Sequence, residues 1–129
     1  MSKIVVIIAA CALAVHGLIH LMGTTVYMRL GAINGLSYKT TMLGGRWDLG
    51  ERGILVFGAL WIVPAIGFVA AAIAMTAGWS WWRDVVVGAA LLSLALTSLD
   101  WTNAFMGAVT DAAILALVWS GPSLARLPL

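Results

Sequence analysis

Long uncharged apolar runs alternate with short polar segments along the whole chain. The first run ends before Arg29, and about 20 apolar residues suffice to cross the hydrocarbon core of a bilayer. Three further apolar runs follow. The pattern predicts an all-α protein, a membrane-embedded antiparallel four-helix bundle that forms one transmembrane domain over residues 1–129. The expected helices cover residues 4–28, 49–78, 81–99 and 103–120.

The segment of residues 30–50 is rich in Gly, Thr, Ser and Asn, which predicts a long extramembrane loop. Loops of this length are often lids or binding loops. Asp48 and Glu51 have the D-x-x-E spacing of a capping box, so the second helix is expected to begin near Leu49. Arg52 follows Asp48 by one helical turn and is expected to pair with it.

Three features predict where the later helices bend or end. Pro64 cannot donate a backbone hydrogen bond to the carbonyl of Leu60, so the second helix should be kinked there. Three tryptophans in residues 79–82 indicate a turn at the level of the lipid headgroups. Gly121 and Pro122 are expected to stop the last helix.

Composition places the chain among integral membrane proteins, because 63% of its residues are apolar, 9% are charged, and the mean hydropathy is +1.05. The net charge of +2 rests on few groups and forms no basic patch, which excludes nucleic-acid binding. Cys11 is the single cysteine, so no internal disulfide can form. Four spans put both termini on one side, and Lys3 favours the cytoplasmic side of a bacterial inner membrane.

His16 and His20 lie one helical turn apart inside the first apolar run. Counted from the loop end at about 1.5 Å per residue, these histidines share a depth of roughly 10–15 Å with Ser93 and Asp111. Ionisable groups in a membrane bundle are costly unless they are paired. The common depth therefore predicts one polar network between the helices that opens towards the loop.

Three interpretations of this network stay open. His16, His20 and Asp111 could bind a divalent metal as a two-histidine, one-carboxylate site. A bis-histidine haem is not expected, because neighbours on one helix cannot occupy opposite axial positions and the chain has no other histidine. Alternatively, the three residues are catalytic, with Asp111 orienting a histidine that acts as a general base on a small amphipathic ligand. The third interpretation is an Asp–His hydrogen bond that only joins two helices.

Further polar residues are expected to contact such a ligand. The candidates are Tyr27, Trp47, Glu51, Arg52, Ser93 and Thr97.

Two segments, HGLIHLMG near the start and YKTTMLGGRWDLGERGI before the second span, occur here in a short four-span chain. This combination resembles a family of small uncharacterised bacterial membrane proteins, some of which carry an ABC-transporter-permease label. The resemblance implies that the histidine stripe, the loop and the segment from Asp48 to Glu51 belong together.

The leading hypothesis is an intramembrane pocket for a small amphipathic or apolar molecule, with the network as its polar floor and residues 30–52 as its lid. The alternative is a small transporter, or an accessory or structural subunit of a larger membrane complex, that forms a homo-oligomer through its glycine and alanine faces. Membrane lipids are expected partners in either case.

Overall fold

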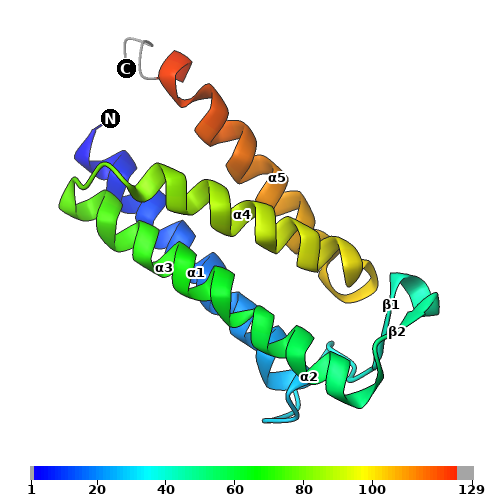
Figure 1. Ribbon diagram of the computed structural model, residues 1–129. Helices are drawn as coiled ribbons and strands as arrows, with labels where there is room; N and C mark the ends of the chain where they lie inside the picture. Colours follow the sequence, from blue (N-terminus) through cyan, green and yellow to red (C-terminus); the bar gives the residue numbers. More distant parts are fainter. Residues whose placement is uncertain (1, 125–129) are drawn as a thin grey trace.

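The computed structural model describes residues 2–124, and within them four helical spans are long and apolar enough to cross a membrane. They run back and forth as an elongated bundle (Figure 1). This confirms the predicted all-α four-helix fold. The helices are α1 (Lys3–Tyr27), α2 (Gly50–Leu60), α3 (Ile62–Ala77), α4 (Trp82–Leu99) and α5 (Trp101–Leu124).

Small residues determine how closely the helices approach one another. A Cβ atom on Gly17 of α1 would lie 2.9 Å from the Cβ of Phe68 on α3, so only glycine fits this crossing. A Cβ on Gly107 of α5 would lie 2.9 Å from Cγ2 of Thr97 on α4. Extended contacts therefore join α1 to α3, α3 to α4, and α4 to α5. In the described part of the chain, no extended contact of this kind joins α1 to α5.

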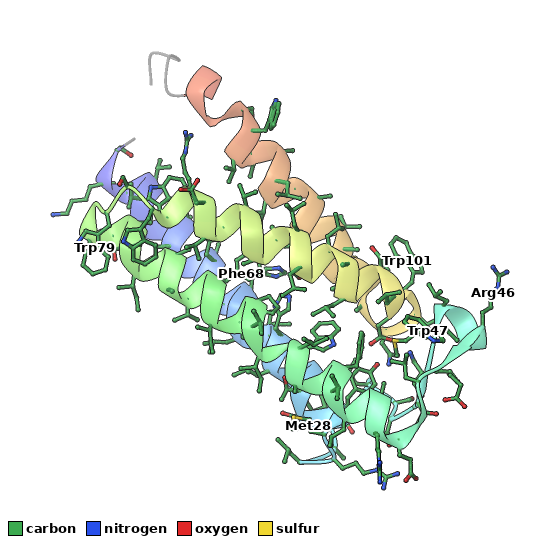
Figure 2. The ribbon with its side chains drawn as sticks, viewed as in Figure 1. Met28, Arg46, Trp47, Phe68, Trp79 and Trp101 are labelled. Carbon is green, nitrogen blue, oxygen red and sulfur yellow. The ribbon has the colours of Figure 1, made fainter. Side chains whose placement is uncertain are left out.

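Aromatic side chains mark both ends of the bundle. Figure 2 labels Phe68 in the middle, Trp79 at the end near the termini, and Trp47 and Trp101 at the opposite end. Trp79 and Trp101 are about half exposed, as expected of side chains at the two membrane interfaces. Phe68, between them, is fully buried.

The helical hydrogen bonding of the second span, Gly50–Ala77, is interrupted at Trp61, although the backbone of this residue stays helical with φ −64° and ψ −21°. α2 ends at Leu60 and α3 begins at Ile62, so the break lies at Trp61, just before Pro64. The missing N–H of Pro64 leaves the carbonyl of Leu60 without its helical donor, which explains this position.

The predicted loop of residues 30–50 contains a small antiparallel hairpin. Strands β1 (Thr41–Met42) and β2 (Trp47–Asp48) pair with each other and are joined by the 3₁₀ turn η1 (Leu43–Gly45). Gly44 and Gly45 have φ angles of 66° and 91°, which a glycine adopts readily. Met42 of β1 is fully buried and packs against helix residues such as Tyr27 and Phe57, so the hairpin is anchored to the bundle.

The capping-box prediction is wrong. Asp48 Oδ1 accepts a hydrogen bond of 2.9 Å from the backbone N–H of Gly50, and the residue that precedes α2 is Leu49, which makes no side-chain cap. This bond and the side chain of Thr40 hold the pKa of Asp48 below its ordinary value. Glu51 instead approaches Arg29, at 4.0 Å. The described ion pairs also do not include the predicted one between Asp48 and Arg52.

The fourth span differs from its predicted bounds mainly at its C-terminal end. α5 runs from Trp101 to Leu124, but Ala104 has non-helical dihedral angles (φ −130°, ψ 18°), so a short first turn is set apart from the main helix close to the predicted start. The helix then passes Gly121 and Pro122. A proline removes only one backbone hydrogen bond of a helix and itself adopts a helical φ angle. Near a helix end this loss is tolerated, which explains why the predicted stop does not act.

Candidate functional site

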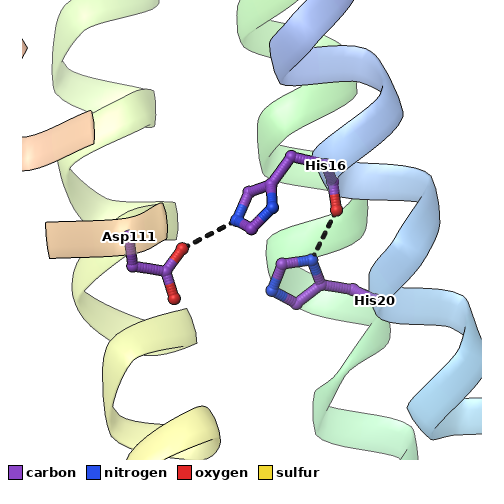
Figure 3. Close-up of side chains that lie close together, drawn as sticks. All are labelled: His16, His20 and Asp111. Carbon is purple, nitrogen blue, oxygen red and sulfur yellow. Dashed lines mark hydrogen bonds and ion pairs between the residues drawn. The ribbon is translucent and has the colours of Figure 1, made fainter. Parts of the chain in front are cut away.

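A cluster of polar side chains lies at the middle of the bundle, where α1, α4 and α5 face one another. α1 contributes His16 and His20, α4 contributes Ser93, and α5 contributes Asp111, as Figure 3 shows for the two histidines and the aspartate. Ser93 and Asp111 are fully buried, and 2% of His20 is exposed. The structure thus brings together the residues that the depth count placed at one level, while their roles in catalysis or binding stay predictions.

Each member of the cluster contacts the next at hydrogen-bonding distance. His16 Nε2 lies 2.8 Å from Asp111 Oδ1, and Ser93 Oγ lies 2.5 Å from Asp111 Oδ2. His20 Nε2 lies 2.5 Å from Ser93 Oγ, and His20 Nδ1 lies 2.8 Å from the carbonyl oxygen of His16. Asp111 therefore links α5 to α1 directly and to α4 through Ser93.

Aromatic rings from the second span enclose the histidines. The Phe68 ring lies 4.9 Å from the His16 ring, and the Trp61 ring lies 5.5 Å from the His20 ring, measured between centroids. Trp61 passes over Gly23, where a Cβ would come within 2.8 Å of its ring. Its indole Nε1 is buried and has no hydrogen-bond partner among the described residues. The sequence analysis did not identify Trp61 and Phe68 as neighbours of the histidines, because an aromatic residue on an apolar helix is equally typical of packing or of the lipid-facing surface.

A pocket of about 260 Å³ borders the cluster. His16 and His20 form its polar surface at one end, and Tyr27, Asp100 and Asn103 form a polar surface at the other end. Apolar groups line most of the wall between the two ends. These are Ile19, Met22, Gly23, Val26, Leu36, Trp61, Ala104, Met106 and Gly107.

The polar end near the loop is a second hydrogen-bonded group. The Tyr27 hydroxyl donates to Asp100 Oδ2, and Asn103 Nδ2 donates to the Tyr27 oxygen over 3.1 Å. Lys39, from the segment before the hairpin, forms an ion pair with Asp100 Oδ1. Ser93, Thr97 and Asp100 fall on one helical stripe of the sequence, and this spacing is the signal that could have found the inward position of Asp100. No comparable signal identifies Lys39 as the partner of Asp100.

The six residues expected to contact a ligand divide into three groups. Tyr27 and Thr97 line the pocket, and Ser93 lies behind the histidines. Trp47, Glu51 and Arg52 are exposed at the loop end and do not line the pocket. A role for these last three in binding therefore has no support from their positions and stays a prediction.

The donor atoms that a metal site needs are present, but they already lie at hydrogen-bonding distance from one another or from neighbouring groups. The candidate ligand atoms of His16, His20 and Asp111 all lie within 4.8 Å of one another, whereas a tetrahedral zinc with bonds of about 2.1 Å holds its ligand atoms roughly 3.4 Å apart. Both nitrogens of His20 have hydrogen-bond partners. The geometry therefore fits a hydrogen-bonded cluster better than a metal centre, and the metal hypothesis stays a prediction.

Comparison with models of known protein families, with curated proteins and with solved structures finds no match to this chain. The resemblance to small bacterial membrane proteins accordingly stays a prediction. The functional argument rests on the geometry of the pocket and its two polar ends.

Proposed function

We propose that this multi-pass membrane protein binds a small, neutral, amphipathic molecule that is dissolved in the bilayer. The supporting observation is a largely apolar pocket between the helices that has hydrogen-bonding side chains at both ends. Such a pocket solvates an apolar body by contact and orients it through a few polar groups. His16 and His20 are the polar floor of this site.

The side of the pocket between α1 and α5 supports entry from the lipid. Ile19 and Met22 of α1 and Met106 of α5 line the pocket, and these three side chains are 52%, 36% and 61% exposed on the surface of the spans. Because α1 and α5 have no extended contact, the pocket reaches the lipid-facing surface between them. A molecule in the bilayer can enter here without crossing the headgroup region.

The size and charge of the pocket narrow the class of ligand. Its volume of about 260 Å³ lies just below the range of about 300–1,000 Å³ that is typical of small-molecule sites. It accommodates a ring or a head group, while an attached chain would extend between α1 and α5 into the lipid. Asp100 and Lys39 neutralise each other at the loop end, so neither end offers a free charge to an ionic head group. A hydroxyl-bearing or carbonyl-bearing amphiphile fits these features best.

The segment before the hairpin is the proposed lid. Leu36 lines the pocket, and Lys39 binds Asp100 beside it. We further propose that the protein lies in a bacterial inner membrane with both termini in the cytoplasm, which would put this lid on the outer side. The alternative of an oligomeric transporter or accessory subunit stays a prediction. Such an oligomer would form through glycine and alanine faces, but Gly17 and Gly107 already pack against other helices of the same chain.

Photolabelling in liposomes tests the pocket. A long-chain alcohol with a diazirine group should label the wild-type protein at residues that line the pocket, such as Met22 and Met106. Thr110→Phe fills the pocket from α5 and should reduce this labelling roughly tenfold, the ratio that corresponds to about 1.4 kcal/mol of binding free energy.

The matched control is Val109→Phe, which places the same side chain one residue away on an exposed face and should leave the labelling unchanged. Equal labelling of the two variants, or labels spread evenly over all exposed helix faces, would contradict the proposed function.

A further inference from the structure

The hydrogens of the buried cluster can be counted from its contacts. His20 Nδ1 lies 2.8 Å from the carbonyl oxygen of His16, and a carbonyl only accepts, so this nitrogen carries a hydrogen. His20 Nε2 lies 2.5 Å from Ser93 Oγ, and Ser93 Oγ lies 2.5 Å from Asp111 Oδ2. Two contacts therefore meet at one hydroxyl group, which has a single hydrogen to donate.

The missing hydrogen has to come from one end of this chain of contacts. If Ser93 donates to Asp111, His20 Nε2 donates to Ser93, and His20 is an imidazolium beside an ionised carboxylate. If Ser93 donates to His20, Asp111 is protonated at Oδ2 and donates to Ser93. Both forms contain the same number of hydrogens and are neutral overall. An ionised Asp111 with a neutral His20 has one hydrogen too few for the observed contacts.

We propose that the cluster holds one proton that moves between Asp111 and His20 through the Ser93 hydroxyl. In one direction, the O–H bond of Asp111 breaks and its hydrogen bonds to Ser93 Oγ, while the original Ser93 hydrogen forms an N–H bond at His20 Nε2. The reverse movement restores the first form. Only the form with an imidazolium separates charges, which the membrane interior penalises.

His16 connects this proton to the pocket. Its Nε2 lies 2.8 Å from Asp111 Oδ1. This oxygen carries no hydrogen in either form of the cluster, so His16 Nε2 is the donor. Among the described residues no group forms a hydrogen bond with His16 Nδ1. His16 also lines the pocket. In a step that rests on the proposed function, a ligand hydroxyl that donates to His16 Nδ1 extends the chain from the ligand to His20. His16 then touches the ligand, while Ser93 is a positioning residue that joins Asp111 to His20.

The surroundings isolate the cluster from other proton donors. The second span presents the rings of Trp61 and Phe68. Thr97 of α4 donates to the carbonyl oxygen of Ser93 over 2.8 Å, and its hydroxyl lies 3.5 Å from Asp111 Oδ2. Among the described hydrogen bonds and ion pairs, no titratable group other than His16, His20 and Asp111 joins the cluster. The nearest further titratable groups that line the pocket are at its loop end.

Spectroscopy on the whole protein in lipid nanodiscs, with no ligand added, tests the hydrogen count. The chain has two histidines, so imidazole ¹⁵N signals are few and His16→Gln assigns them. At neutral pH the infrared spectrum should contain the carbonyl band of a protonated, hydrogen-bonded carboxylic acid that is absent in Asp111→Asn. The ¹⁵N spectrum should show His20 Nε2 as a hydrogen-bond acceptor. If His20 is instead doubly protonated and the acid band is absent, the cluster is in its imidazolium form. That form contains the same number of hydrogens, so this result also supports the proposed hydrogen count.

Ser93 variants test the connection between the two groups. Ser93→Ala should shift the acid band of Asp111 and the Nε2 signal of His20 together, and Ser93→Thr should return both towards their wild-type values. Ser98→Ala is the control, because Ser98 lies on the exposed side of the same helix, and it should change neither signal. If Ser93→Ala does not fold, the wild-type and Asp111→Asn spectra still decide the count.

Three results would overturn the proposal: an ionised Asp111 together with a neutral His20, a Ser93→Ala spectrum identical to the wild type, or about one equivalent of zinc or iron in wild-type protein purified without chelators. A failure of photolabelling, in contrast, would remove the pocket as a ligand site and leave the hydrogen count unaffected. The two proposals therefore fail separately.

Discussion

Asp100 shows how a single side chain holds the loop over the pocket. Its carboxylate is 3% exposed and binds the ammonium group of Lys39 and the hydroxyl of Tyr27. Removing one partner of a buried charge pair leaves the other charge without compensation, which costs more than losing an exposed pair. The attachment of the loop to the bundle therefore depends on this contact much more than on the exposed pair of Arg29 and Glu51.

Lys39→Met should loosen the loop. Lys39 is 25% exposed, so we expect the free energy that holds the loop closed to fall by about 1–2 kcal/mol, which is less than the cost of breaking a fully buried pair. The fraction of molecules with an open loop should then rise roughly 5–30-fold. Cleavage by trypsin after Arg46, which lies on the exposed hairpin, should become faster by a similar factor.

The control for this change is Glu51→Gln, which removes a pair with exposures of 64% and 82% and should leave the cleavage rate unchanged. Equal cleavage rates of the wild type and Lys39→Met would show that the ion pair does not restrain the loop.

At the scale of the elements, the helices and their inward faces could be predicted, because hydropathy and the helical period are local properties of the sequence. His16 and Asp111 were found in this way. The contact of Lys39 with Asp100 could not be predicted, since no periodicity fixes the path of a loop. The interruption at Trp61 lies within one turn of Pro64, where the sequence predicts a disturbed helix, because a proline lacks the N–H that the turn before it needs.

Gly17 offers a test of the crossing between α1 and α3. A Cβ at this position would lie 2.9 Å from Phe68 Cβ and 3.0 Å from the carbonyl oxygen of Ala65. Gly17→Ala should therefore force the helices apart next to His16 and lower the free energy of unfolding by about 1–3 kcal/mol, as overpacking usually does.

Gly88 is the matched control, because a Cβ there meets no atom within 4 Å. Gly88→Ala should leave stability unchanged or raise it by up to about 1 kcal/mol through helix propensity. Thermal unfolding in detergent, followed by circular dichroism, measures both variants. An equal melting temperature for Gly17→Ala and the wild type would mean that the crossing tolerates a methyl group.

At the scale of the whole molecule, the bundle puts the loop of residues 30–50 and the turn between α3 and α4 at opposite ends (Figure 1). In a Cys11→Ala background, cysteines introduced at Ser37 and Ser80 should react with a membrane-impermeant maleimide from opposite sides of the membrane. The proposed orientation predicts that Ser37→Cys reacts in intact spheroplasts, whereas Ser80→Cys reacts only after the membrane is opened.

Detergent-solubilised protein, in which both cysteines should react, is the control for this experiment. Reaction of both from one side would exclude four spans, and the reversed pattern would exclude cytoplasmic termini while retaining the fold.

The opening between α1 and α5 determines which concentration governs occupancy. A pocket that is reached through lipid samples the mole fraction of a compound in the membrane rather than its concentration in water. One acyl chain alone favours the bilayer with a constant on the order of 10⁴ M⁻¹. Few polar contacts then suffice for high occupancy, because partitioning has already concentrated the ligand. Affinities for this protein therefore acquire a physical meaning only when they are expressed per lipid.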